Sequence, residues 1–168
     1  EKTSANAVNA WTGAEMEFQA KDFTLGAVGI EIKFTSSKHP RIKVSNERQL
    51  DAENLSDLFL VLYSTEAVKD NGFSLTSLVA QTRKAISTDE ERSIFNAKLQ
   101  LNGYFDEDSE HYGRMYSLKK TFGFAVTSDF PKIVKNQLPL GIYDTSYSIE
   151  ISAVESFIVE LENILAKV

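Results

Sequence analysis

The sequence predicts one α/β domain in which a mixed β-sheet packs against helices. Three observations lead to this prediction. Residues 28–36 alternate between apolar and polar side chains, residues 58–63 form the apolar run LFLVLY, and residues 74–87 and 89–104 have helical apolar periodicity. The 168 residues are enough for a single domain, residues 1–168, with a sizeable core.

The N-terminal part of the chain is predicted to contain two extended segments joined by a turn with glycine at both ends, Gly26 and Gly29. Residues 2–10 could end a helix that began upstream, and WTG at 11–13 breaks it. Residues 16–25 read as extended, and GAVG at 26–29 predicts a turn. In the strand that follows, the period of two predicts one buried and one polar face. Those expected in the core are Val28, Ile30, Ile32 and Phe34, and those expected on the polar face are Gly29, Glu31, Lys33 and Thr35.

The later elements continue the mixed pattern. Residues 41–45 alternate, with Ile42 and Val44 inward, and LFLVLY predicts a central buried strand. The helix over 74–87 has a predicted Ser74 cap, and the helix over 89–104 has Gly103 as its stop. Strands are predicted over 115–128 and 145–152, and an amphipathic helix over 153–168. The predicted apolar stripes are Leu75, Leu78, Val79, Thr82 and Ile86 in the first helix, and Phe157, Leu161, Ile164 and Leu165 in the last.

The composition excludes several kinds of chemistry. The chain has no cysteine, which rules out disulfides and thiolate catalysis and removes the strongest zinc ligands. The longest apolar run is too short for a membrane-spanning helix, and no signal peptide is visible. We therefore expect a cytoplasmic protein with no membrane partner. Because the chain begins at Glu1, a fragment or a processed product is an open alternative.

The charge is unevenly distributed along the chain. The net charge of −6 argues against a general nucleic-acid binder. Residues 33–48 are nevertheless basic, with Glu47 as their one acid, and a second basic stretch runs from Arg114 to Lys135. Because screening limits the reach of charge to about 8–10 Å at physiological salt, local basic segments matter more than the total.

Two carboxylates and a lysine can meet on the polar face of the first long strand. If the GAVG turn folds residues 21–25 and 28–36 into a hairpin, Asp22 reaches the same face as Glu31 and Lys33. The carboxylates could then hold Mg²⁺, with the Ile32 carbonyl as a further ligand. Lys33 could position or deprotonate an attacking water. This set suits phosphodiester hydrolysis, although a Glu-x-Lys pair on a solvated strand face is also common.

Seven short motifs carry a resemblance to a known family. They are Trp11-Thr12-Gly13, Asp22-Phe23, Glu31-Ile32-Lys33, SNERQL at 45–50, LFLVLY at 58–63, DFPKI at 129–133 and LPLGIYDTSYSIEIS at 138–152. With them, the sequence resembles the PD-(D/E)XK nuclease superfamily. It is similar to a bacterial family named for that motif and found among restriction and defence genes. Lys21 stands where the motif has proline, and the family carries further upstream sequence, including a helix that in many members supplies another glutamate.

The resemblance implies a restriction-endonuclease-like fold, with a mixed central sheet flanked by helices. It implies a Mg²⁺-dependent endonuclease, with Mn²⁺ able to substitute, that hydrolyses DNA in restriction or phage defence. Asp22, Glu31 and Lys33 would be catalytic, and Gln49 would assist them. A homodimer or other defence subunits are the protein partners left open.

Two other functions remain open at this point. The same fold could be a catalytically inactive module for nucleic-acid binding or assembly. A two-carboxylate glycoside hydrolase would leave Lys33 without a role.

We expect DNA to lie across a basic surface beside the site. That surface is formed by Lys38, Arg41, Lys43 and Arg48. Arg41 and Lys43 alternate with Ile42 and Val44, which places them on one polar face. Their strand is expected to pair beside the strand of Glu31 and Lys33, because only a short connection joins the two.

Four further polar features are weaker candidates. Glu17 could be a supplementary acid, although a surface charge is the simpler interpretation. His39 and His111 lie far apart in polar segments, which does not predict a zinc site. The acidic run at 106–111 lacks the spacing of a calcium loop and is expected to be a solvated loop.

Overall fold

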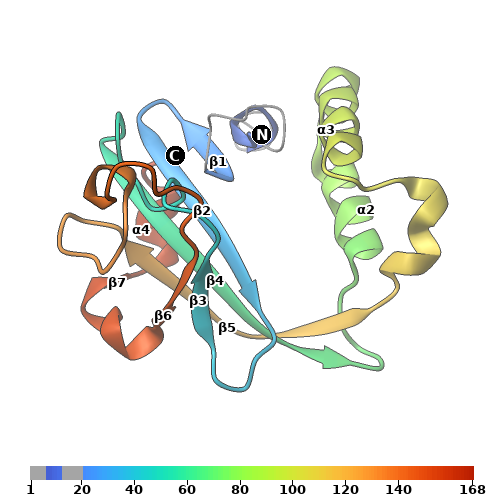
Figure 1. Cartoon of the computed structure of the whole chain (residues 1–168). Coiled ribbons are helices and arrows are strands. Elements are labelled where there is room, and N and C mark those ends of the chain that lie inside the picture. The colour runs from blue at the N-terminus through green and yellow to red at the C-terminus, as the bar shows by residue number, and fades with distance from the viewer. Residues whose placement is uncertain (1–6, 13–20) are drawn as a thin grey trace. The chain divides into compact units, whose positions relative to one another are not determined.

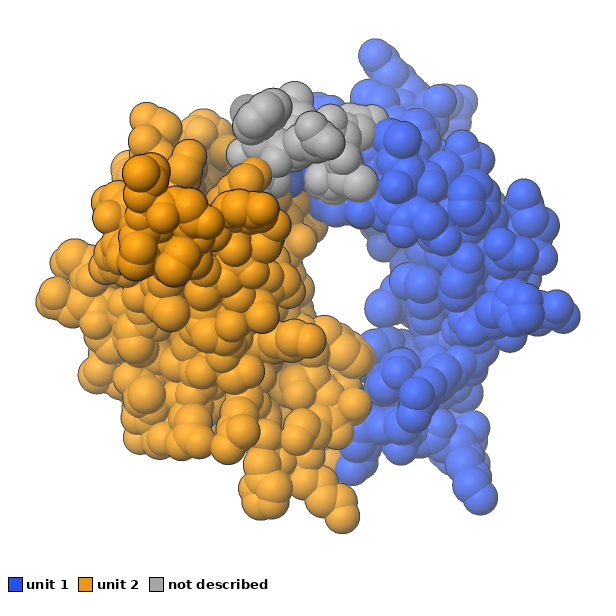
Figure 2. All heavy atoms as spheres, in the orientation of Figure 1, with its two compact units in different colours: residues 1–19, 66–118 blue, residues 20–65, 119–168 orange. Residues whose placement is uncertain are grey.

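The computed structural model describes residues 7–12 and 21–168, which fall into two compact units (Figure 2). The sheet unit consists of residues 20–65 and 119–168. The helical unit consists of residues 1–19 and 66–118. Each is described by itself below, and the expectation of a single domain stays a prediction.

A five-stranded mixed sheet forms the core of the sheet unit (Figure 1). Its order is β1 (Phe23–Leu25), β2 (Val28–Thr35), β4 (Asp57–Val68), β5 (Met115–Ala125) and β7 (Ile158–Val159). The pairs β1–β2 and β5–β7 are antiparallel, and β2–β4 is parallel. The central position of β4 confirms the prediction from its apolar run. This α/β architecture is the restriction-endonuclease-like class that the resemblance implies.

The β1–β2 hairpin forms at the predicted turn. Gly26 adopts a φ of 56°, a left-handed conformation that glycine accepts at little steric cost. The register pairs Phe23 with Ile30 and Leu25 with Val28. The hairpin therefore brings the residues just before β1 alongside the middle of β2.

The predicted pairing of residues 41–45 beside β2 is wrong. Strand β3 (Arg41–Val44) instead pairs antiparallel with β6 (Tyr147–Glu150) in a separate two-stranded sheet. The physical reason is that β1 and β4 already occupy the two edges of β2. Ile42 and Val44 point inward as expected and are fully buried.

Both faces of the five-stranded sheet are packed. One face joins β4 and β5 to the β3–β6 sheet through a core whose fully buried members include Ile42, Leu60 and Phe124. The other face packs Ile30 and Phe59 against Ile164 of the short helix α4 (Leu161–Leu165). Burial on both faces explains why residues 58–63 of β4 form an unbroken apolar run.

The predicted C-terminal helix is wrong over most of its length. The segment forms short 3₁₀ turns at Ile151–Ala153 and Glu155–Phe157, then β7, and only then α4. Val159 pairs with Gly123 of β5, so backbone pairing at the sheet edge replaces the helix that the periodicity favours. Leu165, expected in the apolar stripe, is exposed.

The helical unit contains the two predicted central helices. Helix α2 (Leu75–Ala85) is capped by Ser74, which accepts from the Ser77 N–H, and α3 (Asp89–Leu101) is followed by Gly103 at φ 79°. Of the stripe predicted in the first helix, Val79 and Ile86 are buried, which confirms those two. The other three members, Leu75, Leu78 and Thr82, are exposed, so the prediction is wrong for them.

Short elements complete the helical unit and the connections. Residues 7–10 are helical, and the buried Lys98 of α3 donates to the Val8 carbonyl at 3.0 Å. The acidic run forms a 3₁₀ segment, η2 (Asp106–Tyr112), and η3 (Lys135–Gln137) precedes β6. Within residues 7–12 and 21–168, no helix has the length and apolar character needed to cross a membrane.

Candidate active site

The hairpin brings Asp22 to the same face as Glu31, as the sequence predicts. One step beyond the Phe23–Ile30 pair, Asp22 stands opposite Glu31, and cross-strand neighbours share a face. Asp22 Oδ2 accepts a hydrogen bond from the Ile32 N–H at 2.7 Å. The N–H and C=O of a strand residue point to the same edge, so the Ile32 carbonyl also faces the Asp22 side.

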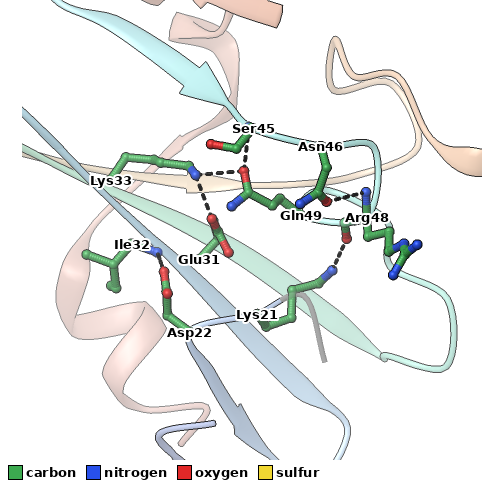
Figure 3. A network of polar contacts seen from close by, with 9 residues as sticks. All are labelled: Lys21, Asp22, Glu31, Ile32, Lys33, Ser45, Asn46, Arg48 and Gln49. Atoms are coloured by element: carbon green, nitrogen blue, oxygen red, sulfur yellow. Dashed lines mark hydrogen bonds and ion pairs between the residues drawn. The ribbon is translucent and has the colours of Figure 1, made fainter. Parts of the chain in front are cut away.

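Lys33 joins Glu31 to Gln49 (Figure 3). Its Nζ lies 2.7 Å from Glu31 Oε1 and donates to Gln49 Oε1 at 2.8 Å. Gln49 Oε1 also accepts from the Ser45 N–H at 2.7 Å, which holds the amide within its own loop. The structure thus brings together the four side chains that the sequence and the resemblance name as catalytic.

The face that carries these residues is not solvated, which corrects the sequence-based expectation. Glu31 is only 1% exposed, and the Lys33 side chain is 13% exposed. Gln49 of segment 45–50 contacts the Lys33 ammonium, and Lys21 Nζ donates to the Arg48 carbonyl at 2.5 Å (Figure 3). Conversely, Phe34, expected in the core, is 52% exposed.

Burial changes the acidity of the site. It raises the pKa of Glu31 to about 7, and the charge of Asp22 adds to the rise, while Lys33 and Lys21 oppose it. In the absence of a cation, Glu31 is therefore near half-protonation at neutral pH. Burial also lowers the pKa of Lys21, against the opposing charges of Glu31 and Asp51.

The residues present fit a magnesium ion. Glu31 Oε2 is buried and has no hydrogen-bond partner among the residues that the structure describes. The charge of Asp22 acts on Glu31, and the Asp22 carboxylate and the Ile32 carbonyl are oxygen donors of the kind that Mg²⁺ prefers. In the described residues no three histidine, cysteine or acidic side chains gather. Two carboxylates suffice for Mg²⁺, because it usually keeps several waters.

Two residues of this region were missed by the sequence reasoning. Lys21 was noted only as a replacement for proline, yet it binds the Arg48 carbonyl and lowers the Glu31 pKa. Glu47 is 2% exposed and accepts from the Thr145 N–H at 2.9 Å. Its own backbone N–H, then those of Thr145 and Asp144, hold its pKa below the usual value. The sequence did carry a signal for Glu47, because it is the one acid in the basic segment 33–48.

The four predicted DNA-binding residues are all exposed. They are Lys38, Arg41, Lys43 and Arg48. Arg41 and Lys43 share the outer face of β3, but Arg41 pairs with Glu150 at 3.0 Å. Opposite Lys43 stands Ser148 rather than an acid. Their role in DNA binding stays a prediction.

One weaker candidate, Glu17, lies outside the described residues. His39 is exposed, and the exposed His111 lies 3.8 Å from Glu110. In the acidic run, Asp106 pairs with Arg83 at 2.9 Å in the helical unit.

Comparison with known proteins identifies the chain at family level. A family model described as "Putative PD-(D/E)XK family member, (DUF4420)" matches residues 1–152. Neither a curated protein nor a solved structure matches the chain.

Proposed function

We propose, from the premise that this chain belongs to that PD-(D/E)XK family, that it is a Mg²⁺-dependent endonuclease that hydrolyses DNA phosphodiester bonds. The observation that carries the proposal is the buried carboxylate of Glu31. One oxygen binds Lys33, and the other has no hydrogen-bond partner among the described residues. Such an atom is costly unless a ligand satisfies it, and a cation next to Asp22 would do so.

The residues of the site have distinct tasks in this proposal. Glu31, Asp22 and the Ile32 carbonyl would hold the ion, which when bound polarises the phosphate and lowers the pKa of a bound water. Lys33 would orient the attacking water and offset negative charge at phosphorus. Gln49 would keep the Lys33 ammonium in place, because its Oε1 is fixed by Ser45.

The reaction consumes one water for each bond that is cut. The water oxygen forms a new bond to phosphorus while one bridging P–O bond breaks. The water loses a proton, and the departing oxygen takes one up. A substitution at Lys33 should therefore reduce cleavage more than it reduces DNA binding.

A plasmid-nicking assay tests the proposal. Wild type should nick supercoiled DNA in Mg²⁺ or Mn²⁺ but not in EDTA, and Lys33→Ala should remove the activity. Lys84→Ala, at an exposed lysine of α2, is the matched control and should cleave normally. Equal nicking by wild type and Lys33→Ala would indicate a contaminating nuclease. Failure of both on several DNA and RNA substrates would favour the catalytically inactive module.

The proposed setting is bacterial restriction or phage defence in the cytoplasm, and the resemblance alone supports it. Phage should form fewer plaques on a lawn of bacteria that express wild type than on a lawn that expresses Lys33→Ala at the same protein level. Equal plaque counts would remove the defence role without bearing on the nicking activity. Sedimentation of the purified chain tests the homodimer that the resemblance leaves open.

A further inference from the structure

An apolar loop tip is presented to solvent between η3 and β6. In the segment that leads into β6 (Figure 1), Leu140 is fully exposed, Ile142 is 53% exposed and Tyr143 is 74% exposed. Large apolar side chains concentrated in one short exposed segment often mark a binding surface. The proposed chemistry uses none of these three residues.

The tip has a defined backbone. The Ile142 N–H donates to the Pro139 carbonyl at 3.1 Å, which closes a turn over residues 139–142. Gly141 occupies the third position at φ 88°, a conformation that suits glycine. The apolar side chains are therefore held outward by an ordered turn.

The loop is tied at its base and along its C-terminal side. The Tyr147 hydroxyl accepts from the Ile133 N–H at 3.0 Å, which joins the two ends of the loop. Between the tip and Tyr147, the Thr145 N–H donates to the buried Glu47. Glu47 lies two residues before Gln49, which binds the Lys33 ammonium. A short path of covalent and hydrogen bonds thus connects the loop to the site.

The charges around the loop suit a nucleic acid. Arg48 follows Glu47 directly, Lys135 precedes the loop in η3, and Lys43 lies on β3, whose partner β6 follows the loop. All three are exposed. Asp144 is the one acid of the tip, so the tip itself would make apolar and aromatic contacts, with phosphates held by the surrounding cations.

We infer that Leu140, Ile142 and Tyr143 form a wedge that stacks on unpaired or opened bases. The inference rests on the proposed function, since it makes the substrate DNA with single-stranded or distorted segments. Aromatic and apolar side chains gain from contact with the face of any base once that base leaves the stack. In a perfect duplex those faces are covered, so the wedge contributes less there.

Fluorescence anisotropy in EDTA tests the wedge without cleavage. The probes are a labelled single strand, its perfect duplex, and a duplex with a mismatched bubble. Changing Leu140, Ile142 and Tyr143 together to serine should weaken binding to the single strand and the bubble by about tenfold or more, a range set by base stacking. Duplex binding should change little. Leu165→Ser, at an exposed leucine of α4, is the matched control and should bind as wild type does.

Photocrosslinking supplies a direct readout of contact. A single strand that contains 5-iodouracil should crosslink to Tyr143, and Tyr143→Ala should lose that adduct in peptide mapping. Unchanged affinity in the triple variant, no binding of any probe by wild type, or a dimer of wild type that the triple variant abolishes would each overturn the wedge. The last result would make the tip a contact between copies of the chain. If the triple variant binds more weakly but wild type does not nick DNA, the nuclease proposal fails and the wedge stands. If wild type nicks DNA but the triple variant binds as tightly as wild type, the wedge fails and the nuclease proposal stands.

Discussion

Two ion pairs of the sheet unit have similar lengths and different surroundings. Lys33 lies 2.7 Å from Glu31 along β2, and Arg41 lies 3.0 Å from Glu150 across β3 and β6. The first pair is nearly excluded from water, whereas the side chains of Arg41 and Glu150 are 62% and 64% exposed. Burial raises the pKa of Glu31 in the first pair. The comparison shows that burial, and not length, makes an ion pair chemically distinctive.

The largest expected effect comes from breaking the buried pair. Lys33→Ala leaves Glu31 buried without its cation and Gln49 Oε1 without its ammonium donor, so the free energy of unfolding should fall by more than about 1 kcal/mol. The loss should be greater at pH 8 than at pH 5, because Glu31 is protonated at the lower pH and needs no cation. Urea denaturation at both values checks this, with Arg41→Ala as the exposed counterpart. A loss below about 1 kcal/mol at pH 8 would place the pair in the exposed class.

The second effect is a pH dependence that belongs to Glu31. Its pKa is raised from 4.5 to about 7 in the folded chain, so the neutral form favours folding. That contribution is fully present below pH 4.5 and is lost as pH rises through 7. It amounts to on the order of 3 kcal/mol. Relative to Glu31→Gln, wild type in EDTA should therefore lose stability between pH 4.5 and 8.

Added Mg²⁺ sharpens the same measurement. The ion competes with the proton for Glu31, so it should stabilise wild type more at pH 8 than at pH 5. Glu31→Gln should show little of this stabilisation at either pH. Parallel pH curves for wild type and Glu31→Gln in EDTA would contradict the raised pKa, and equal stabilisation of both by Mg²⁺ would place the ion elsewhere.

The third effect concerns the affinity for DNA of the surface around the exposed pair, Arg41 and Glu150. Lys43 has Ser148 opposite, whereas the Arg41 guanidinium is engaged by Glu150. Lys43→Ala should therefore weaken duplex binding and reduce the salt slope by about 1, as for the loss of one phosphate contact. Glu150→Gln should strengthen binding by releasing Arg41. A salt titration by anisotropy measures both, and superimposed curves would show that DNA does not cross β3.

The smallest effect is the contribution of the exposed pair to stability. A double-mutant cycle of Arg41→Ala and Glu150→Ala should give a coupling energy of about 0.2–1 kcal/mol, reduced further by salt. A coupling above about 2 kcal/mol that persists at high salt would contradict the contrast between the two pairs.

The sequence by itself determined the local geometry of the candidate site. A strand places every second side chain on one face, so the alternation in residues 28–36 put Glu31 and Lys33 together. The glycine turn at 26–29 then predicted the hairpin that brings Asp22 opposite Glu31. Gln49 entered only through the resemblance, because no local pattern links it to a lysine sixteen residues away.

Only the tertiary structure decided which faces and edges are covered. Sequence periodicity showed a polar face on β2, but Glu31 pairs with Leu60 of β4, on the side of the sheet that packs against β3 and β6, and is buried there. Strand β3 pairs with β6, more than a hundred residues later, because β1 and β4 occupy both edges of β2. The same holds for residues 158–159, which join the edge of β5 despite a helical pattern. Periodicity follows from backbone geometry within a few residues, whereas burial and edge pairing depend on distant segments competing for the same surface.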